Sequence, residues 1–276
     1  MKAGISEIIL QDLSLEEFFA RSARAGYEVV ELCLGGKCPL QLSTKDRLIP
    51  EIARLSQAYR LPVASLVQWQ CTGNLLAGGE EQRIGIEQTC EGLEIARQTG
   101  AKASLHTLGE LSPDLYYGEA YENAVASLKK IAGTAEKTGV ALAVEFVWNG
   151  FLFSPLEMKR LLEDVGSEWV GFYFDPGNMA IFQYPHHWVR ALGKHIKAMH
   201  MKDWEGHVLD GSWRTVSAGN VLEGQWTALL EGKVNFALLM AELRAAGYAG
   251  PLINEVEVAL APIERTARDI KRIRNW

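Results

Sequence analysis

Four side chains with metal-binding and acid–base chemistry stand at the ends of apolar runs in the second half of the chain. They are Glu145 in VALAVEF, Asp175 in WVGFYFD, His200 in HIKAMHMKD and Glu255 in PLINEVE. An ionised carboxylate is costly to bury without a partner, so each acid must turn to solvent or meet a cation or hydrogen-bond donors. If the fold gathers all four, the carboxylates repel one another and resist ionisation unless a cation lies between them. The oxygen-rich set is typical of Mn²⁺, which we expect, with Mg²⁺, Co²⁺ or Zn²⁺ as alternatives.

The elements that would position these residues alternate regularly between strands and helices. β-rich runs are followed by runs of helical period, and Gly or Pro usually separates them. The helix at 14–26 has both ends marked, because Ser14 is a capping residue, Glu17 follows three positions later and Gly26 ends the pattern. Predicted strands cover 2–5, 27–34, 61–69, 102–107, 140–146, 169–175, 195–203 and 251–257. The other predicted helices cover 46–59, 82–99, 121–138, 154–165, 187–192, 236–246 and 262–273.

Eight βα units with near-continuous apolar strands predict an α/β protein with a single (β/α)8 TIM barrel, and we expect one domain over 1–276. An open doubly wound sheet is the structural alternative. In a barrel, the carboxyl ends of the strands form the reactive face, so residues distant in sequence meet there. The irregular stretch from Trp204 to Gln225 is too long for a routine turn and is a candidate lid or substrate loop.

Composition excludes several classes of protein. The chain has 276 residues, 48% of them hydrophobic, and a net charge of −6, so it has no overall basic field for nucleic acid. Its four cysteines, Cys33, Cys38, Cys71 and Cys90, form no CxxC pair and are interpreted as reduced thiols. The N-terminus lacks a signal-like apolar segment and no apolar run is long enough to span a bilayer. We therefore expect a cytoplasmic protein with no nucleic-acid or membrane partner.

Motifs along most of the chain carry a family resemblance. They are AGYEVVEL, VALAVEF, FDPGN, HMKDW, LLEGKVNF and GYAGPLINEVE, in this order between about residue 15 and residue 257. Each is weak alone, but their order and their places on the strands together resemble the xylose-isomerase-like TIM barrels. The resemblance is to the sugar (phosphate) isomerase/epimerase branch, which includes inosose dehydratases, hydroxypyruvate isomerases and ketose 3-epimerases.

The resemblance implies a metal centre and a reaction. It assigns one catalytic metal ion to Glu145, Asp175, His200 and Glu255, and the roles of acid and base to Glu145 and Glu255 on opposite sides of the substrate. Abstracting a proton next to a carbonyl is difficult, so a metal that polarises the carbonyl and holds the enediolate is required. Returning the proton to the neighbouring carbon gives isomerisation, and returning it to the opposite face of the same carbon gives epimerisation.

Several further polar residues are candidates for substrate binding. Asn178 stands where ketose 3-epimerases usually place a histidine, which puts the specific 3-epimerase label in doubt. Lys202 belongs to the HxKD motif, and Glu31 and His106 end the second and fourth strands. His106 has a structural, hydrogen-bonded role as its alternative. Asp203 is a candidate supporting partner of the metal site, or it caps the strand end.

Three tryptophans follow strands of the predicted barrel and are candidates to pack on the C–H face of a sugar. They are Trp69, Trp148 and Trp204, and filling the barrel mouth is their alternative role. Phosphate recognition has little support, since Lys202, Lys233 and Arg214 are scattered and no Gly-rich cradle exists. The predicted substrate is a small, unphosphorylated keto-sugar or polyol.

Other functions fit the same residues. A lyase or dehydratase acting on an inosose or a keto-glycoside would use the same proton abstraction and then lose a β-hydroxyl. An apurinic endonuclease-like DNA repair enzyme shares the barrel but needs additional histidine ligands, and the chain has six histidines in all. A non-catalytic sugar-binding subunit would have no need of two opposed bases. The sugar, the metal and the oligomeric state, including a homo-oligomer, stay open.

Overall fold

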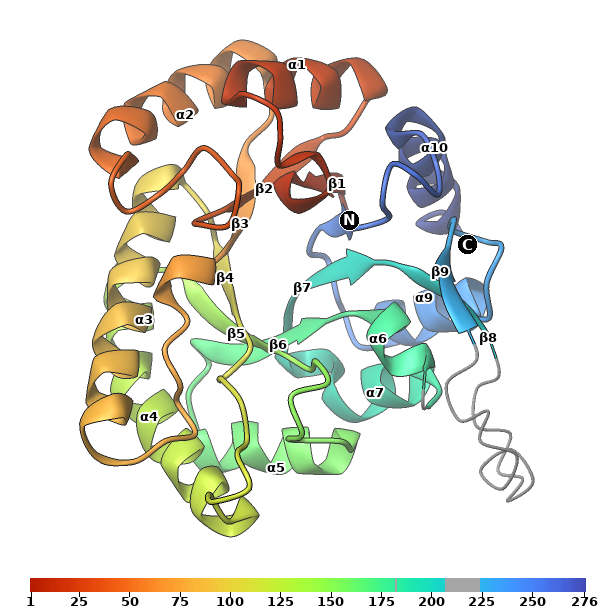
Figure 1. The fold of residues 1–276 in the computed structure, drawn as a ribbon. Coiled ribbons are helices and arrows are strands. Elements are labelled where there is room, and N and C mark those ends of the chain that lie inside the picture. Colours follow the sequence, from red (N-terminus) through yellow and green to blue (C-terminus); the bar gives the residue numbers. More distant parts are fainter. Residues whose placement is uncertain (182, 207–223) are drawn as a thin grey trace.

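A closed barrel of eight parallel strands forms the centre of the protein, and helices surround it in the computed structural model shown in Figure 1. The structure describes residues 1–181, 183–206 and 224–276. The barrel strands are β1 (Ala3–Ser6), β2 (Val29–Cys33), β3 (Val63–Val67), β4 (Ala103–His106), β5 (Ala141–Glu145), β6 (Val170–Phe174), β7 (Ile196–Met201) and β10 (Leu252–Asn254). β1 pairs with both β2 and β10, which closes the ring and confirms the predicted barrel over the open sheet.

The helices follow the strands as the sequence pattern predicts, except for one short helix directly after β6, which was not predicted. They are α1 (Leu15–Ala25), α2 (Lys45–Tyr59), α3 (Gly79–Thr99), α4 (Tyr117–Thr138), α5 (Pro155–Val165), α6 (Pro176–Ala180), α7 (Pro185–Leu192), α9 (Phe236–Ala245) and α10 (Ile263–Ile273). In α1 the capping box is present, because Ser14 Oγ accepts from the Glu17 N–H and the Glu17 carboxylate accepts from the Ser14 N–H. Gly26 ends this helix in the left-handed region, with φ of 85°, where glycine carries no Cβ penalty.

Helix boundaries differ from prediction where no side chain caps the first turn. α4 begins at Tyr117 rather than at the predicted residue 121, and Tyr116 makes no capping hydrogen bond. α3 begins at Gly79, three residues earlier than predicted, after an uncapped Gly78. Without a Ser, Thr, Asp or Asn cap, the sequence offers no start signal at these two helices. Among the described residues, no helix is long and apolar enough to cross a membrane.

The stretch between β7 and α9 differs from the single irregular loop predicted for 204–225. Its two ends form an antiparallel pair, β8 (Asp203–Gly206) and β9 (Gly224–Thr227), in which Trp204 lies opposite Trp226. The pair stands beside the barrel mouth, next to α6 and α9 in Figure 1. The central part of the predicted lid, 207–223, lies outside the described residues. Arg214, considered above for phosphate binding, belongs to that part.

Candidate metal centre and substrate cavity

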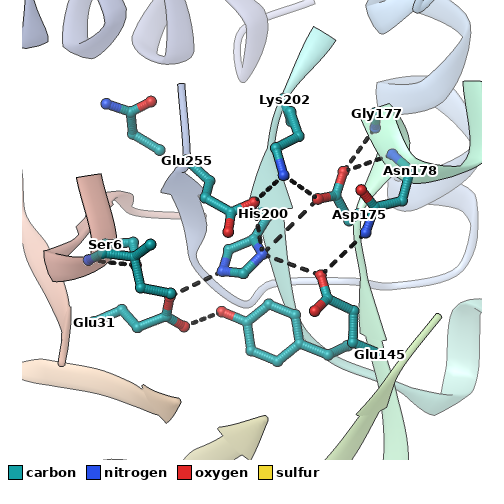
Figure 2. A network of polar contacts seen from close by, with 12 residues as sticks. Ser6, Glu31, Glu145, Asp175, Gly177, Asn178, His200, Lys202 and Glu255 are labelled. Carbon is teal, nitrogen blue, oxygen red and sulfur yellow. Dashed lines mark hydrogen bonds and ion pairs between the residues drawn. The ribbon is translucent and has the colours of Figure 1, made fainter. Parts of the chain in front are cut away.

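Four neighbouring strands bring their functional side chains together at one end of the barrel. The carboxylates of Glu145, Asp175 and Glu255 lie around the imidazole of His200. His200 Nδ1 lies 3.3 Å from Glu145 Oε1, 3.4 Å from Glu255 Oε2 and 4.0 Å from Asp175 Oδ2. Figure 2 shows the three carboxylates pointing toward this nitrogen from different sides. His200 and Asp175 are fully enclosed, whereas Glu255 retains some contact with solvent. The barrel therefore assembles the cluster that the strand ends predicted.

The DPGN segment explains how an acid ends a buried strand. Asp175 caps the short helix α6, because its Oδ1 accepts from the N–H groups of Gly177 at 2.7 Å and Asn178 at 3.1 Å. Pro176 is the first helical residue, where a missing N–H costs nothing. The second oxygen, Oδ2, is buried, turns toward His200 and accepts no hydrogen bond. One carboxylate oxygen thus fixes the turn, and the other is left for a cation.

Glu31 lies beneath His200 rather than at an open surface. Its side chain is 0% exposed, and its Oε1 is 2.9 Å from His200 Nε2. Its Oε2 accepts hydrogen bonds from Ser65 Oγ at 2.6 Å and from the Tyr173 hydroxyl. Burial favours the neutral acid, but the charge of His200 and these hydrogen bonds lower the pKa of Glu31 below its usual value. A carboxylate here orients the ring so that Nδ1 faces Glu145 and Glu255.

The described residues alone do not balance the charges of the cluster. Burial raises the pKa of Glu145 to about 7, an effect that His200 partly offsets and that the charges of Glu255 and Asp175 increase. Burial opposes protonation of His200, but Glu255 and Glu31 raise its pKa well above its usual value. Within the part of the chain that the structure describes, the cations that contact the carboxylates of Glu31, Glu145, Asp175 and Glu255 are His200 and Lys202. The fully ionised cluster would therefore keep excess negative charge, which a divalent cation would compensate.

The donor set fits a divalent metal ion. One atom each from Glu145, Asp175 and His200 lies within 4.8 Å of the others, and all three residues are buried. Asp175 Oδ2 accepts no hydrogen bond from the described residues and meets Lys202 Nζ only as an ion pair at 3.4 Å, so it has room for a further cation. Glu255 Oε2 stands 3.4 Å from the same ring nitrogen and is the fourth candidate ligand. Carboxylate oxygens with one imidazole suit Mn²⁺, Mg²⁺ or Zn²⁺.

Lys202 connects the cluster to its surroundings. Its Nζ lies 2.6 Å from Glu255 Oε2 and 3.4 Å from Asp175 Oδ2, and it stands over the Trp226 ring at 4.7 Å from the centroid. Burial disfavours the charged amine, but Asp175 and Glu255 raise the pKa of Lys202 above its usual value. The stem runs past Gly177, where an added Cβ would come within 2.8 Å of Lys202 Cγ. The glycine of DPGN therefore makes room for the lysine of HxKD.

Asn178 is the amide that the sequence places after Asp175, and it is buried against Glu145. Its Nδ2 donates to the Phe146 carbonyl oxygen at 3.1 Å and lies 3.5 Å from Glu145 Oε1. Its Oδ1 is buried and accepts no hydrogen bond. Asn178 thus fixes the position of Glu145 while offering one unused acceptor at the cluster.

Three of the other candidates lie away from the cluster. Both ring nitrogens of His106 are engaged, Nδ1 accepting from the Leu108 N–H at 2.8 Å and Nε2 lying 3.1 Å from Thr89 Oγ1. Trp69 is 42% exposed and packs against the turn at Gly36. Asp203 accepts four backbone N–H bonds, which come from Trp204, Leu230, Gly232 and Val234. The contacts of Asp203 tie the loop before α9 to β8 rather than supporting the metal cluster directly.

The other two tryptophans form an aromatic group with Trp226 at the barrel mouth. The rings of Trp148 and Trp226 are tilted by 34° with centroids 5.8 Å apart, and Trp204 meets Trp226 edge-on at 5.0 Å. Trp148 is 47% exposed and Trp204 is buried at 8%. A cavity of about 400 Å³ lies on this side of the cluster, and Lys202, Trp226 and Glu255 are among its lining residues.

Sequence reasoning missed several residues of the site. Ser65 and Tyr173 carry no strand-end signal, because they lie within buried strands and point into the barrel toward Glu31. Trp226 follows a stretch with no clear periodicity, so nothing in the sequence connects it with Lys202. Glu7, a buried acid outside the cluster, had a detectable signal, since it directly follows the first strand. Burial raises the pKa of its carboxyl to about 7, and its Oε2 accepts from the Cys33 N–H.

The enclosed His106 leads to a prediction about acid stability. Burial lowers the pKa of His106 from 6.5 to about 4, so between these values the unfolded chain binds a proton that the folded chain does not. The free energy of unfolding should therefore rise with pH across this window and gain nothing further from His106 above about pH 6.5. Urea unfolding at several pH values between 4.5 and 6 measures this dependence. In His106→Gln the free energy of unfolding should rise less steeply with pH than in the wild type, by up to ~1.4 kcal/mol per pH unit. Equal slopes would show that the native state accommodates the charged ring.

Comparison with known proteins identifies the family. The model of the family described as xylose isomerase-like TIM barrel matches residues 19–276, and the chain belongs to this family. A curated relative is L-ribulose-5-phosphate 3-epimerase UlaE of Salmonella paratyphi C (strain RKS4594), 25% identical over 194 residues. The match covers 67% of this chain and spans 62% of the length of that relative.

Solved structures share the fold over nearly the whole chain. A D-tagatose 3-epimerase-like protein is 20% identical, with a TM-score of 0.79 over 100% of this chain and 98% of that one. The IOLI protein, in a structure with a bound zinc atom, is 18% identical, with a TM-score of 0.77 over 99% of this chain and 96% of its own. At these identities the likeness shows the xylose isomerase-like barrel, which agrees with the family match.

Proposed function

We propose that the protein is a divalent-metal-dependent isomerase or epimerase of a small, unphosphorylated keto-sugar or polyol, which it converts by abstracting a proton next to a carbonyl. The observation that carries this proposal is the approach of two carboxylates, Glu145 from β5 and Glu255 after β10, to the same nitrogen of His200 at 3.3 and 3.4 Å. Figure 2 shows them on different sides of the ring. Proton removal and proton return need two such groups around one substrate carbon.

Glu145, Asp175, His200 and Glu255 would hold the metal ion, which we propose to be Mn²⁺. When bound, the ion supplies positive charge that polarises a carbonyl and stabilises negative charge developing beside it. The carboxylate-rich donor set supports a hard divalent cation, as does Asp175 Oδ2, which is buried and accepts no hydrogen bond from the described residues. The zinc atom of the similar IOLI structure supports a metal ion in a barrel of this kind.

The surrounding residues have separate roles in this proposal. Glu145 and Glu255 remove and return the proton, and Asn178 Nδ2 keeps the Glu145 carboxylate in place. Glu31 holds His200 through Nε2, so that Nδ1 is directed at the metal ligands. Lys202, at the boundary between cluster and cavity, donates to substrate oxygens.

Charge in the cavity supports an unphosphorylated substrate. Among its described lining residues the cation is Lys202, which already contacts two carboxylates, and the acids are Glu255 and Glu257. Without the metal ion these three side chains carry a net charge of −1, and Lys202 is already paired with carboxylates, so the described lining offers a phosphate no separate cationic cradle. The name of the curated relative includes a sugar phosphate, so L-ribulose 5-phosphate belongs in the test beside the free sugars.

Solvent deuterium exchange tests the proposed function. The Mn²⁺-loaded protein is incubated in deuterated water with free ketoses, inososes, keto-glycosides and L-ribulose 5-phosphate, and NMR follows the proton on the carbon next to the carbonyl. We expect exchange and an isomer or epimer of unchanged mass apart from deuterium. A product lighter by one water would instead identify a lyase. Absence of exchange with every substrate, while the protein binds Mn²⁺, would refute the proposal.

A further inference from the structure

The ammonium group of Lys202 contacts two oxygens that the proposed metal ion would use as ligands. Its Nζ lies 2.6 Å from Glu255 Oε2 and 3.4 Å from Asp175 Oδ2. The same two oxygens face His200 Nδ1, at 3.4 and 4.0 Å. In Figure 2 dashed lines run from the Lys202 amine to both carboxylates. Two of the four candidate ligands are therefore already paired with a cation that belongs to the protein.

Asp175 cannot serve the two cations through separate oxygens. Its Oδ1 accepts from the N–H groups of Gly177 and Asn178, so Oδ2 is the oxygen left for either Lys202 or a metal ion. A divalent ion bound by Asp175 Oδ2 and Glu255 Oε2 would meet the ammonium group at close range. The site is enclosed, and like charges repel more strongly there than in water.

A second position for the ammonium group lies next to the first. Nζ stands over the Trp226 ring, 4.7 Å from its centroid, and Lys202 also lines the cavity of about 400 Å³ beside the cluster. The face of an indole attracts an ammonium ion. The lysine stem is held where it passes Gly177, but its end rotates freely about several single bonds. The charged group can therefore leave the carboxylates for the Trp226 face while the stem stays in place.

We propose that Lys202 is an internal counterion that competes with the metal ion for Glu255 and Asp175. In the metal-free protein the ammonium group neutralises part of the cluster, and metal binding displaces it toward Trp226 and the cavity. There its N–H groups are free to donate to a substrate oxygen, so loading of the metal ion precedes and prepares binding of the substrate. This inference rests on the metal site of the proposed function and adds an order of events to it.

A lysine that stayed on Glu255 and oriented it for the metal ion would have the opposite effect on affinity. Removing a group that orients a metal ligand weakens binding, usually by about 10–100-fold. Removing a competing cation strengthens binding, because the ion no longer has to displace it or lie beside it. The sign of the change in metal affinity therefore distinguishes a competitor from a supporting residue.

Calorimetric titration with Mn²⁺ measures this sign without any substrate. Lys202→Met keeps an unbranched apolar stem and removes the charge, and it should bind Mn²⁺ about tenfold or more tightly than the wild type. The matched control is Lys194→Met, because Lys194 is exposed in the short 3₁₀ helix Gly193–His195, at the opposite end of β7 from Lys202. It loses the same charge and should keep the wild-type dissociation constant.

A measurement on the wild type avoids dependence on the folding of the variant. The protein is treated briefly with an N-hydroxysuccinimide acetate ester, with and without saturating Mn²⁺, and mass spectrometry gives the yield of acetylation at each lysine. Acetylation of Lys202 should increase when Mn²⁺ is added, because the displaced amine faces the cavity instead of two carboxylates. Acetylation of Lys194 in the same sample should stay constant.

The outcomes keep this inference apart from the proposed function. Equal or weaker Mn²⁺ binding in Lys202→Met, or acetylation of Lys202 that stays constant or falls with Mn²⁺, overturns the inference and leaves the metal site standing. Absence of Mn²⁺ binding by the wild type refutes the metal site and the inference with it. If Mn²⁺ binds as expected and no sugar exchanges deuterium, the proposed reaction fails while the competition between Lys202 and the ion stands.

Discussion

Glu145→Gln should lower kcat for deuterium exchange by about 10²–10⁴-fold, the usual contribution of a positioned general acid or base. The amide keeps the shape of the side chain but cannot take up a proton. Glu255→Gln should give a loss of the same order, because the proposed reaction needs one group to remove the proton and one to return it. Exchange kinetics at saturating Mn²⁺ measure both effects.

Two controls distinguish lost proton transfer from a lost fold or lost metal. Glu168→Gln makes the same chemical change at an exposed position just before β6, at the opposite end of the strand from Asp175, and should retain wild-type rates. Mn²⁺ titration and circular dichroism of each variant show whether the ion and the fold are retained. Wild-type rates in Glu145→Gln or Glu255→Gln would contradict the assigned roles.

The barrel was predictable because its signals are local and repeated. The capping box of Ser14 and Glu17 and the final Gly26 mark one helix completely, and similar glycines end α3, α4 and α5. Eight βα units whose strands are apolar on both faces favour a closed ring over an open sheet, and the pairing of β1 with β10 in the structure decides between them. The four residues of the cluster could be predicted for the same reason, since parallel strands in a barrel end at one face.

The rest of the site depends on contacts that no local pattern encodes. Glu31 was predicted at the end of the second strand, but it lies in the middle of β2, whereas Glu145 does end β5, and the Glu31 carboxylate points inward to Ser65 and Tyr173. Whether a strand-end acid faces the cavity or the barrel interior depends on the pleat and the shear of the ring, and the sequence alone does not give this register. The β2–β3 pairing even shifts register between Val30 and Glu31. Trp226 reaches Lys202 only because β9 pairs with β8, which the irregular sequence between them conceals.

Glu31→Gln should weaken Mn²⁺ binding by about 10–100-fold, the usual effect of changing a group that orients a metal-ligating histidine. The carboxylate holds His200 Nε2 at 2.9 Å, and its negative charge increases the basicity of the ring whose Nδ1 faces the cluster. A neutral amide of the same shape keeps the packing but removes that charge. Calorimetric titration with Mn²⁺ measures the dissociation constant without any need for a substrate.

The informative control is Tyr173→Phe, which removes one hydrogen bond to Glu31 and leaves the carboxylate beside His200. Its effect on Mn²⁺ affinity should be smaller than that of Glu31→Gln, because the charge and the contact with Nε2 remain. At subsaturating Mn²⁺, kcat should fall more in Glu31→Gln than in Tyr173→Phe. Both losses should largely disappear at saturating Mn²⁺, since neither residue touches the substrate in the proposed mechanism. If Glu31→Gln binds Mn²⁺ as tightly as the wild type, Glu31 does not act through His200. A loss of kcat that persisted at saturating Mn²⁺ would instead place its effect on the chemical step.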